Sequence, residues 1–318
     1  MGGVRAALLA AVCVAALGLT GCTKTPTVGD GSLGVDWAVL PTPSVAVPAV
    51  GGCTTADSLD QVAGWTLSFL PGTDVACALP HLTETYHVGT FPADVDTDPT
   101  TVPTIGTARF RYAYGECVGK AAEFLGGDLQ TSRLAVVPVL PSERQWAGMA
   151  RWFRCELIEV AGLDNRVAGR AGSLHDALAP GSTNAGQGNS IGPLTATCAD
   201  VTFSDSTANR EVVAVSFTSC QSQHDAELVG AYTLPEGDYP SRATIQETQR
   251  TECPSAGAAY VGVAVGQLLP AGTQTYTFAA DIDEQQWSVG DRSAWCFYGS
   301  FARRLTTSVR GLGAYPYA

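Results

Sequence analysis

The most chemically suggestive cluster in the sequence is Cys220-x3-His224-Asp225-Ala-Glu227. A cysteine thiolate and an imidazole at this spacing can both bind zinc, and an imidazole oriented by a carboxylate can act as a general base. His224 and Glu227 are three positions apart, so a helical turn would bring them to one face. No second short-spaced pair of metal ligands accompanies them. We therefore favour a structural or recognition role, in which His224 bonds the backbone and Glu227 caps a turn or pairs with an arginine. Catalysis by these two residues is the alternative.

A second cluster pairs a tryptophan with an arginine five residues later, at Trp146 with Arg151 and at Trp287 with Arg292. A tryptophan at a fixed distance from a cysteine is most often core, packed against the sulfur atoms. The functional alternative is a sugar- or peptide-binding platform in which the arginine contacts a carboxylate. The binding candidates from both clusters are His81, His224, Asp225, Glu227, Trp146, Arg151, Trp287 and Arg292.

Both clusters belong to a pattern that occurs twice in the chain. Cys77-x3-His81 corresponds to Cys220-x3-His224, and Glu143-x-Gln-Trp146 corresponds to Glu284-x-Gln-Trp287. Each tryptophan is followed by x4-Arg-x3-Cys, and Glu-Cys precedes it in both halves. The first copy is looser, because Leu82 and Thr83 stand where the second copy has Asp and Ala. So many matches in one order predict two homologous domains.

Eight cysteines fall within these two copies, four in each. An even number of cysteines in an exported chain is typical of disulfides. Identical pairing in both copies leaves three possible connectivities, and the sequence alone does not choose among them. We favour the sequential one, which joins Cys53 to Cys77, Cys117 to Cys155, Cys198 to Cys220, and Cys253 to Cys296.

The start of the chain is typical of an export signal. Arg5 is followed by an apolar run from Ala6 to Leu19, which is short for a membrane span. The run ends in Leu-Thr-Gly-Cys22, which resembles the lipobox of bacterial lipoproteins. We therefore expect a signal peptide over residues 1–21 and two acyl chains on Cys22, enough for stable membrane attachment. Cleavage elsewhere, with Cys22 incidental, is the alternative.

Composition and charge narrow the class of protein. Hydrophobic residues make up 45% of the 318 residues, which is normal for a globular chain. The net charge of −12 argues against binding nucleic acid and against electrostatic adhesion to anionic lipid. We expect a Pro-, Thr- and Gly-containing tether over residues 22–50, domains over 51–178 and 191–318, and a flexible linker over 179–190.

The pattern of apolar residues predicts an α+β fold in each domain, with a small, mostly antiparallel sheet and one or two helices. In the second domain, strands are expected over residues 211–217, 228–234, 275–280 and 294–301. A helix is expected over 241–250, and Pro254 is expected to separate it from a second helix over 256–261. In the first domain we expect a helix around 119–125 and a strand over 134–139.

One further letter match concerns calcium. Asp94-x-Asp96-x-Asp98 is similar to the start of a calcium-binding loop, but Pro99 replaces its glycine and Ile105 its bidentate glutamate. A solvated turn is the better interpretation. We expect no metal and no other cofactor.

Taken together, the motifs resemble the septum-formation domain family of actinobacterial envelope proteins, in two tandem copies. The residues that carry the resemblance in the second copy are Cys220, His224, Asp225, Ala226, Glu227, Val229, Gly230, Pro240, Cys253, Trp287, Gly290, Arg292 and Cys296. The resemblance implies an exported or membrane-attached protein connected with division septa, and it implies no catalytic residues. We therefore expect a non-enzymatic lipoprotein on the outer face of the cytoplasmic membrane that binds an envelope or division protein or a wall component. An extracellular hydrolase or transferase acting through His224 and Glu227 is the alternative.

Overall fold

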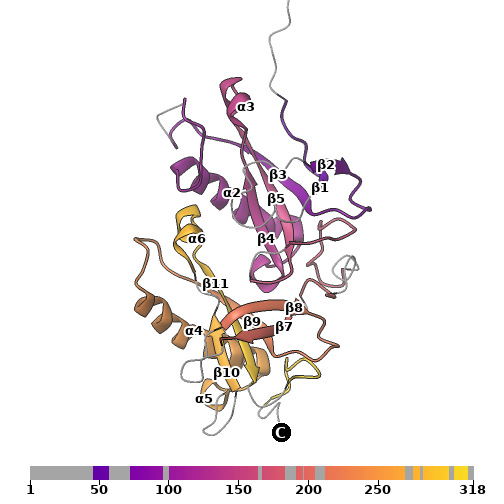
Figure 1. Ribbon diagram of the computed structural model, residues 1–318, viewed down its shortest axis with the longest axis vertical. Coiled ribbons are helices and arrows are strands. Elements are labelled where there is room, and N and C mark those ends of the chain that lie inside the picture. Colours follow the sequence, from indigo (N-terminus) through magenta and orange to yellow (C-terminus); the bar gives the residue numbers. More distant parts are fainter. Residues whose placement is uncertain are drawn as a thin grey trace, which may run out of the picture. The chain divides into compact units, whose positions relative to one another are not determined.

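The computed structural model contains two antiparallel sheets, each with one long helix against it (Figure 1). The signal peptide, Cys22, and most of the expected tether and linker lie outside the described residues, as does part of the Asp94–Asp98 segment. The structure describes residues 46–56, 72–95, 100–163, 167–182, 191–195, 197–204, 212–268, 275–279, 282–300 and 304–313.

The first sheet has the strand order β2-β1-β3-β5-β4, and β6 pairs with β5. Its long helix, α2, packs against β3, β4 and β5. The bounds are β1 Cys53–Ala56, β2 Gly72–Val75, β3 Thr83–Thr90, α2 Ala108–Leu125, η3 Leu129–Thr131, β4 Leu134–Val139, α3 Glu143–Ala147, β5 Trp152–Val160 and β6 Val167–Ala168.

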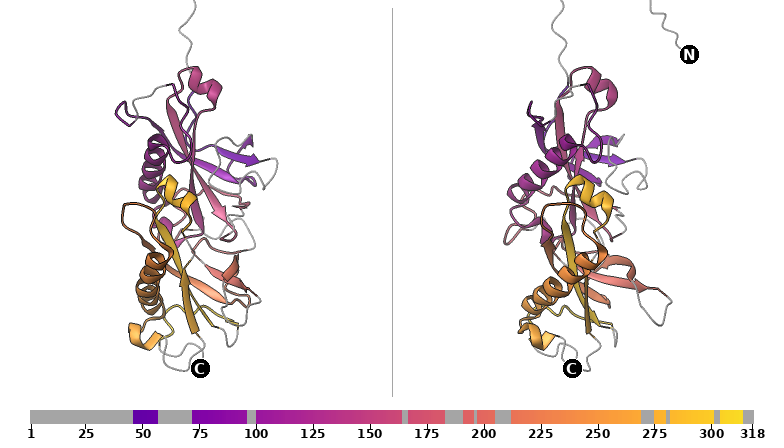
Figure 2. Two further views of the ribbon diagram at one scale, coloured as in Figure 1. Left: turned by 60° about the vertical axis from the view of Figure 1, so that its left-hand side comes forward. Right: turned by 90° about the vertical axis from the view of Figure 1, so that its left-hand side faces the viewer.

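The second sheet has the order β10-β11-β9-β7-β8, and α4 packs against β9, β10 and β11 (Figure 2). The expected α+β class is confirmed. The bounds are β7 Cys198–Phe203, β8 Val212–Thr218, β9 Ala226–Thr233, α4 Arg242–Val261, α5 Val265–Leu268, β10 Thr275–Ala279, α6 Glu284–Val289 and β11 Ser293–Ser300. The strands expected in this half therefore fall within one or two residues of β8, β9, β10 and β11.

Helix α2 begins well before the expected segment 119–125. Its first half contains Gly115 and several aromatic residues, which are weak helix formers. Thr107 nevertheless caps it, since the Thr107 side chain accepts from the Phe110 N–H, and Gly126 at φ 68° ends it. Packing of its apolar face against the sheet outweighs local propensity.

Helix α4 is continuous across Pro254, so the expectation of two separate helices is wrong. Proline removes one backbone hydrogen bond and crowds the preceding turn, but it does not forbid a helix that is held from outside. Cys253 is fully buried and disulfide-bonded to Cys296 of β11, which fixes the helix at this point. Ser255 Oγ also donates to the Thr251 carbonyl in the turn around the proline, at 3.1 Å.

The four disulfides have the sequential pairing. In each half, one bond joins the long helix to a central strand, through Cys117–Cys155 and Cys253–Cys296. The other joins the start of a strand to the turn that precedes the buried histidine. Equivalent bonds thus occupy equivalent places in both halves.

The repeated glycines of β3 and β9 allow close packing over the sheet. A Cβ on Gly89 would lie 2.2 Å from the Phe153 ring, and a Cβ on Gly230 would lie 3.1 Å from the Ala256 Cβ of α4. No side chain fits at Gly89 unless the ring moves. The Val-Gly pair seen twice in the sequence therefore reflects a packing requirement.

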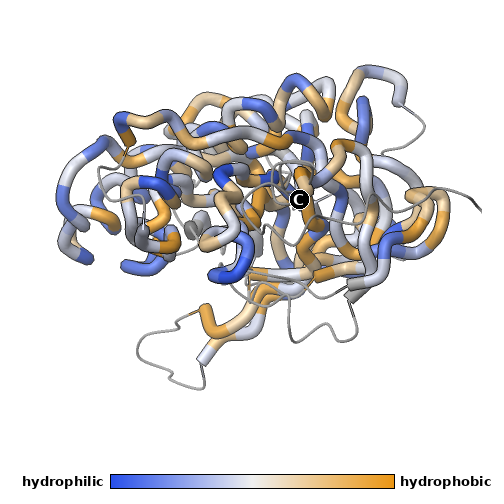
Figure 3. Tube along the Cα trace, turned by 90° about the horizontal axis from the view of Figure 1, so that it is seen from above, coloured by the Kyte–Doolittle hydropathy of each residue, from blue (hydrophilic) through white to orange (hydrophobic). Residues whose placement is uncertain are grey.

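The two halves share hydrophobic core. Val289 of α6 and Leu194 pack in the cluster formed by α2, β4 and β5, and both are at most 1% exposed. A second cluster combines Ile158 of β5 with Phe217 of β8 and Phe297 of β11. Figure 3 shows hydrophobic and hydrophilic positions interspersed along the trace. Among the described residues, no helix has the length and apolar character needed to cross a membrane.

Candidate functional site

The His224–Glu227 pair lies at the entry to β9 and is fully buried. The backbone of His224 pairs with that of Leu305 in an isolated antiparallel bridge, which fixes the position of the imidazole. Its Nδ1 donates to the Ser222 carbonyl at 2.9 Å, and its Nε2 lies 3.2 Å from Glu227 Oε1. The expected backbone bond of His224 is therefore present, and its partner carboxylate comes from the next strand instead of from a helical turn.

Glu227 accepts hydrogen bonds on both oxygens from a segment late in the chain. Oε1 accepts from the backbone N–H of Val309 at 2.8 Å, besides the contact with His224. Oε2 accepts from Tyr260 Oη and Ser308 Oγ, both at 2.7 Å. The carboxylate thus ties β9 to α4 and to the segment around 308, and it has no lone pair facing solvent.

These contacts set the charges of the pair. Burial alone would lower the pKa of His224, but its hydrogen bonds to Glu227 and Ser222 raise that pKa above 6.5 overall. Burial would raise the pKa of Glu227, but the hydrogen bonds from His224, Tyr260, Ser308 and Val309 lower it below 4.5. Burial and the charge of Glu227 raise the pKa of Tyr260 to about 12. These shifts favour the imidazolium form of His224 and the carboxylate form of Glu227, and they favour the protonated hydroxyl of Tyr260 as a donor.

The first half has an equivalent backbone bridge and an equivalent buried glutamate, but its histidine does not contact that glutamate. His81 pairs by backbone with Arg170, and Glu84 accepts from Ser173 Oγ at 2.5 Å and from the Leu174 N–H at 2.6 Å. In both halves the serine lies three residues after the bridge partner. His81 Nδ1 lies 2.8 Å from the Leu79 carbonyl, but its buried Nε2 has no hydrogen-bond partner in the part of the chain that the structure describes. Within the described ranges, the fully buried histidine–carboxylate pair is therefore found in the second half, whereas the His87–Glu116 and His175–Asp176 pairs of the first half are partly exposed.

Charged residues instead gather around Glu159 in the first half. Its Oε1 lies 2.8 Å from Arg133 Nη1 and its Oε2 lies 3.4 Å from Arg170 Nη1, with all three side chains at most 2% exposed. Burial lowers the pKa of both arginines, and the negative charge of Glu159 opposes this. Arg133 also donates to the Gly192 carbonyl at 2.8 Å, so the network holds the segment that leads into the second half.

Sequence reasoning missed Ser173, Ser308, Tyr260 and the Glu159 network as partners of the buried carboxylates. The repeat itself could have indicated the serines. Arg170-x2-Ser-Leu and Leu305-x2-Ser-Val correspond to each other and extend the repeated pattern beyond the last cysteine of each half. The arginines carry no such signal, because a charged residue in a sequence is ordinarily expected at the surface.

Asp225 lies apart from the buried pair, with a side chain that is one-quarter exposed. Its Oδ2 accepts from the Val201 N–H at 3.0 Å, and its Oδ1 lies 3.2 Å from Arg304 Nε. It therefore fastens β7 to the segment at 304, and it does not join the His224–Glu227 pair.

The two tryptophan–arginine pairs have different exposure. Trp146 is 2% exposed, with the Arg151 guanidinium 3.9 Å and the Arg109 guanidinium 5.0 Å from its ring centre. Trp287 is only half-buried, with Arg292 at 5.1 Å. Of the two indole rings, only that of Trp287 is open to a ligand.

The sulfur atoms near the buried pair are used in disulfides. Cys198, His224 and Glu227 offer ligand atoms within 4.8 Å of one another. The Cys198 sulfur is bonded to Cys220, so neither cysteine supplies the thiolate that zinc requires. The Cys53, Cys77 and Glu84 group of the first half is equally occupied by a disulfide.

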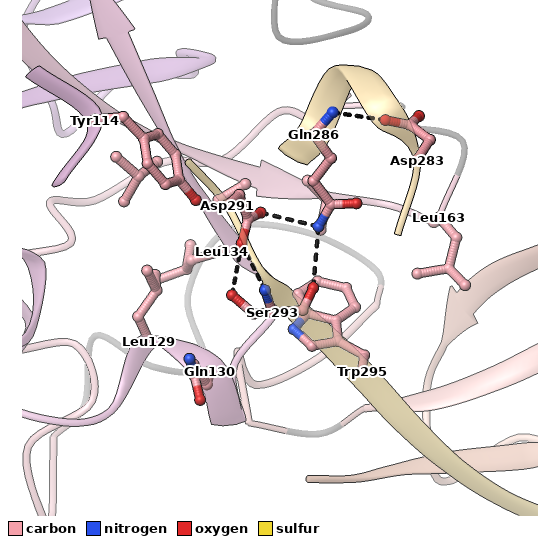
Figure 4. Close-up of a pocket in the computed structure, with 14 residues that line it drawn as sticks. Tyr114, Leu129, Gln130, Leu134, Leu163, Asp283, Gln286, Asp291, Ser293 and Trp295 are labelled. Carbon is pink, nitrogen blue, oxygen red and sulfur yellow. Dashed lines mark hydrogen bonds between the residues drawn. The ribbon is translucent and has the colours of Figure 1, made fainter. Parts of the chain in front are cut away.

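A separate cavity of about 170 Å³ lies between β4, β5 and η3 on one side and α6 and β11 on the other (Figure 4). Leu163 and Trp295 line one part of it. Gln286 and Asp291 line another, joined by a 3.0 Å hydrogen bond from Gln286 Nε2 to Asp291 Oδ2. Of these residues, Gln286 belongs to the repeated Glu284-x-Gln-Trp287 motif, and the sequence indicated no cavity at any of them.

The fold and these sites define a disulfide-stabilised α+β protein. Each half has a buried glutamate that accepts hydrogen bonds from a serine hydroxyl and from the backbone N–H of the next residue. The sequence model for septum formation proteins matches residues 51–296 as one span. The chain belongs to the septum formation family, and the matched span includes both halves. No match was found among curated proteins or among solved structures.

Proposed function

We propose that this protein is a non-enzymatic, lipid-anchored envelope protein that binds an envelope protein or a wall component during septation or envelope assembly. Membership of the septum formation family carries the connection with septa. The anchor and the export signal rest on the sequence that ends at Cys22.

The geometry of the His224–Glu227 pair supports a non-enzymatic role. A general base must lie within hydrogen-bonding reach of a substrate proton. Both side chains are 0% exposed, both imidazole nitrogens have partners, and both carboxylate oxygens of Glu227 accept at least two hydrogen bonds. Catalysis there would require the segment around Ser308 to leave.

Imaging in dividing cells tests the septal role. The full chain, fused to a fluorophore that folds outside the cytoplasm and expressed at native level, is expected to concentrate at new septa. Uniform envelope fluorescence would overturn the septal role. If the protein does concentrate at septa, crosslinking there, followed by identification of the attached molecule, would reveal the partner.

The anchor is tested with two cysteine variants. The Cys22→Ala chain is expected to lose incorporation of a clickable fatty acid and to leave the membrane fraction. Cys13→Ala is the matched control, because Cys13 lies inside the apolar run of the signal. Retention of the label by Cys22→Ala would contradict lipidation at this residue.

A further inference from the structure

The cavity between η3, β4, β5, α6 and β11 has the size of a single small ring. Its volume is about 170 Å³. An apolar protein cavity of roughly 150 Å³ accommodates benzene. A six-membered ring therefore fits, whereas a drug-sized molecule, which needs at least about 300 Å³, does not.

The charges of the cavity exclude an anionic ligand. The described lining residues include no lysine, arginine or histidine, and they include the carboxylates of Asp283 and Asp291. Phosphate and carboxylate groups are bound by cationic side chains or by several convergent N–H donors. The cavity offers no cation to such groups, and its two carboxylates repel them.

Both carboxylate oxygens of Asp291 already accept hydrogen bonds from the protein. Its Oδ1 accepts from Ser293 N at 2.9 Å and from Ser293 Oγ at 2.6 Å. Its Oδ2 accepts from Gln286 Nε2, and its carboxylate also accepts from the Tyr114 hydroxyl. A ligand therefore gains nothing by bonding to Asp291.

Gln286 is oriented as an acceptor. Its Nε2 donates to Asp291 Oδ2 and to the Ser293 carbonyl, both at 3.0 Å, which uses both amide protons. Oε1 is then left with its lone pairs toward the cavity, on the side of Leu163 (Figure 4). An acceptor held in this way selects a ligand that carries hydroxyl or amide donors.

The remaining wall is apolar and partly aromatic. The half-buried indole of Trp295 and the side chain of Leu163 present flat and aliphatic surface, and the half-buried amide of Gln130 adds a donor and an acceptor. A ring with C–H groups on its face and hydroxyl groups at its edge matches this combination. A purely apolar ring would leave Gln286 Oε1 and Gln130 without partners.

We propose that this cavity binds one uncharged saccharide ring, which packs against Trp295 and Leu163 and donates hydroxyl hydrogen bonds to Gln286 Oε1. The proposal deepens the proposed function, because it names the chemistry of a wall component. It is nevertheless tested on purified protein, so its outcome does not depend on where the protein lies in the cell.

The experiment is saturation-transfer NMR with the full chain carrying Cys22→Ser, so that no lipid is attached. The probes are N-acetylglucosamine, glucose and glucose 6-phosphate. We expect saturation transfer to N-acetylglucosamine or glucose, and at least tenfold weaker binding of glucose 6-phosphate because of its charge. Absence of transfer to both neutral sugars, or equal binding of the phosphorylated sugar, would overturn the proposal.

Variants locate the binding in the cavity. Leu163→Trp fills the cavity, and Gln130→Ala removes a half-buried amide that lines it. Each is expected to weaken sugar binding at least tenfold with an unchanged circular dichroism spectrum. Gln221→Ala, at an exposed position outside the cavity, is the matched control and should bind like the parent. Binding that survives both Leu163→Trp and Gln130→Ala would place the sugar elsewhere and refute the inference.

Discussion

At the scale of single residues, Glu84 and Glu227 have equivalent hydrogen-bond partners in the two halves of the chain. Glu227 and Glu84 each accept a serine hydroxyl and the following backbone N–H from a segment that ends their half of the chain. The spacing of Glu227 from His224 left catalysis open as the alternative in the sequence. In the structure, the hydrogen bonds of Glu227 and Glu84 hold chain segments that lie more than 80 residues away in the sequence.

Replacement of Glu227 by alanine should be strongly destabilising. It leaves the His224 imidazolium, Tyr260 and the Val309 N–H without their partner in a buried site, and loss of one member of a buried ion pair costs about 3–5 kcal/mol. Urea denaturation measures the change in the free energy of unfolding. The control is Glu247→Ala, whose exposed ion pair with Arg250 is worth less than about 0.5 kcal/mol. Equal stability of the two variants would contradict the structural role of Glu227.

The pKa values of the pair predict a stability optimum in mildly acidic solution. The raised pKa of His224 gives stability that is complete below pH 6.5 and is lost as pH rises through the folded-state value. The lowered pKa of Glu227 gives stability that is complete above pH 4.5 and is lost as pH falls through its folded-state value. The contribution of the pair is therefore largest between these two pH values.

The variant His224→Gln should remove the alkaline part of this dependence. In the parent chain, the free energy of unfolding should fall as the pH rises above 6.5, by at most about 1.4 kcal/mol per pH unit. Denaturation at pH values from 5 to 9 measures it. His175→Gln, at an exposed histidine, should retain the parent slope. A parent-like slope in His224→Gln would assign the effect to another group.

At the scale of elements, each long helix is fastened to its sheet by a disulfide and by buried apolar residues. Cys117 and Cys253 are both 0% exposed, on α2 and α4 respectively. The second helix needs this support more, because Pro254 interrupts its backbone hydrogen bonds. The disulfide accordingly allows a continuous helix where the local sequence favours a break.

Removal of the Cys253–Cys296 disulfide should therefore be costly. Chain entropy predicts a loss of about 4 kcal/mol for a loop of this length. The double variant Cys253→Ala and Cys296→Ala is expected to lower the midpoint of urea denaturation and the helical circular dichroism signal together. The equivalent variant at Cys117 and Cys155 is the comparison, and it should lose stability with less loss of helicity. A larger loss of helicity there would contradict a special dependence of α4 on its disulfide.

At the scale of the whole molecule, the two halves are joined by shared core as well as by chain connectivity. Leu194 and Val289, from the second half by sequence, pack among residues of the first. Arg133 holds the segment at Gly192 through a hydrogen bond. The domain boundaries at residues 178 and 191 remain predictions, and the shared core makes independent behaviour of the halves energetically unfavourable.

We expect the two halves to unfold together. Circular dichroism and tryptophan fluorescence should report one urea transition, since exposing either core exposes part of the other. Leu194→Ala should keep a single transition and lower the free energy of unfolding by about 2–5 kcal/mol, the usual cost for a buried leucine. Leu312→Ala, at a residue that is 54% exposed, is the control. Two separated transitions in the parent chain would contradict the shared core.

Features that depend on local pattern could be predicted from the amino-acid sequence alone. Alternating apolar residues located β8, because a strand with one buried face repeats every two residues. The duplicated motifs indicated equivalent disulfides in the two halves, because homologous segments place their cysteines alike. They also supported the resemblance to the septum formation family, whose sequence model matches residues 51–296.

The positions of the buried charges and their partners could not be predicted from the sequence, because they depend on the folded chain. Ser308 is 81 residues from Glu227, and Gly192 is 59 residues from Arg133, so no local pattern relates them. The start of α2 and the continuity of α4 were likewise decided by packing and by a disulfide, against the local preference of the chain. Burial and long-range hydrogen bonds are properties of the folded chain, and they place Tyr260, Ser308 and Val309 around Glu227, which the spacing of His224 and Glu227 does not indicate.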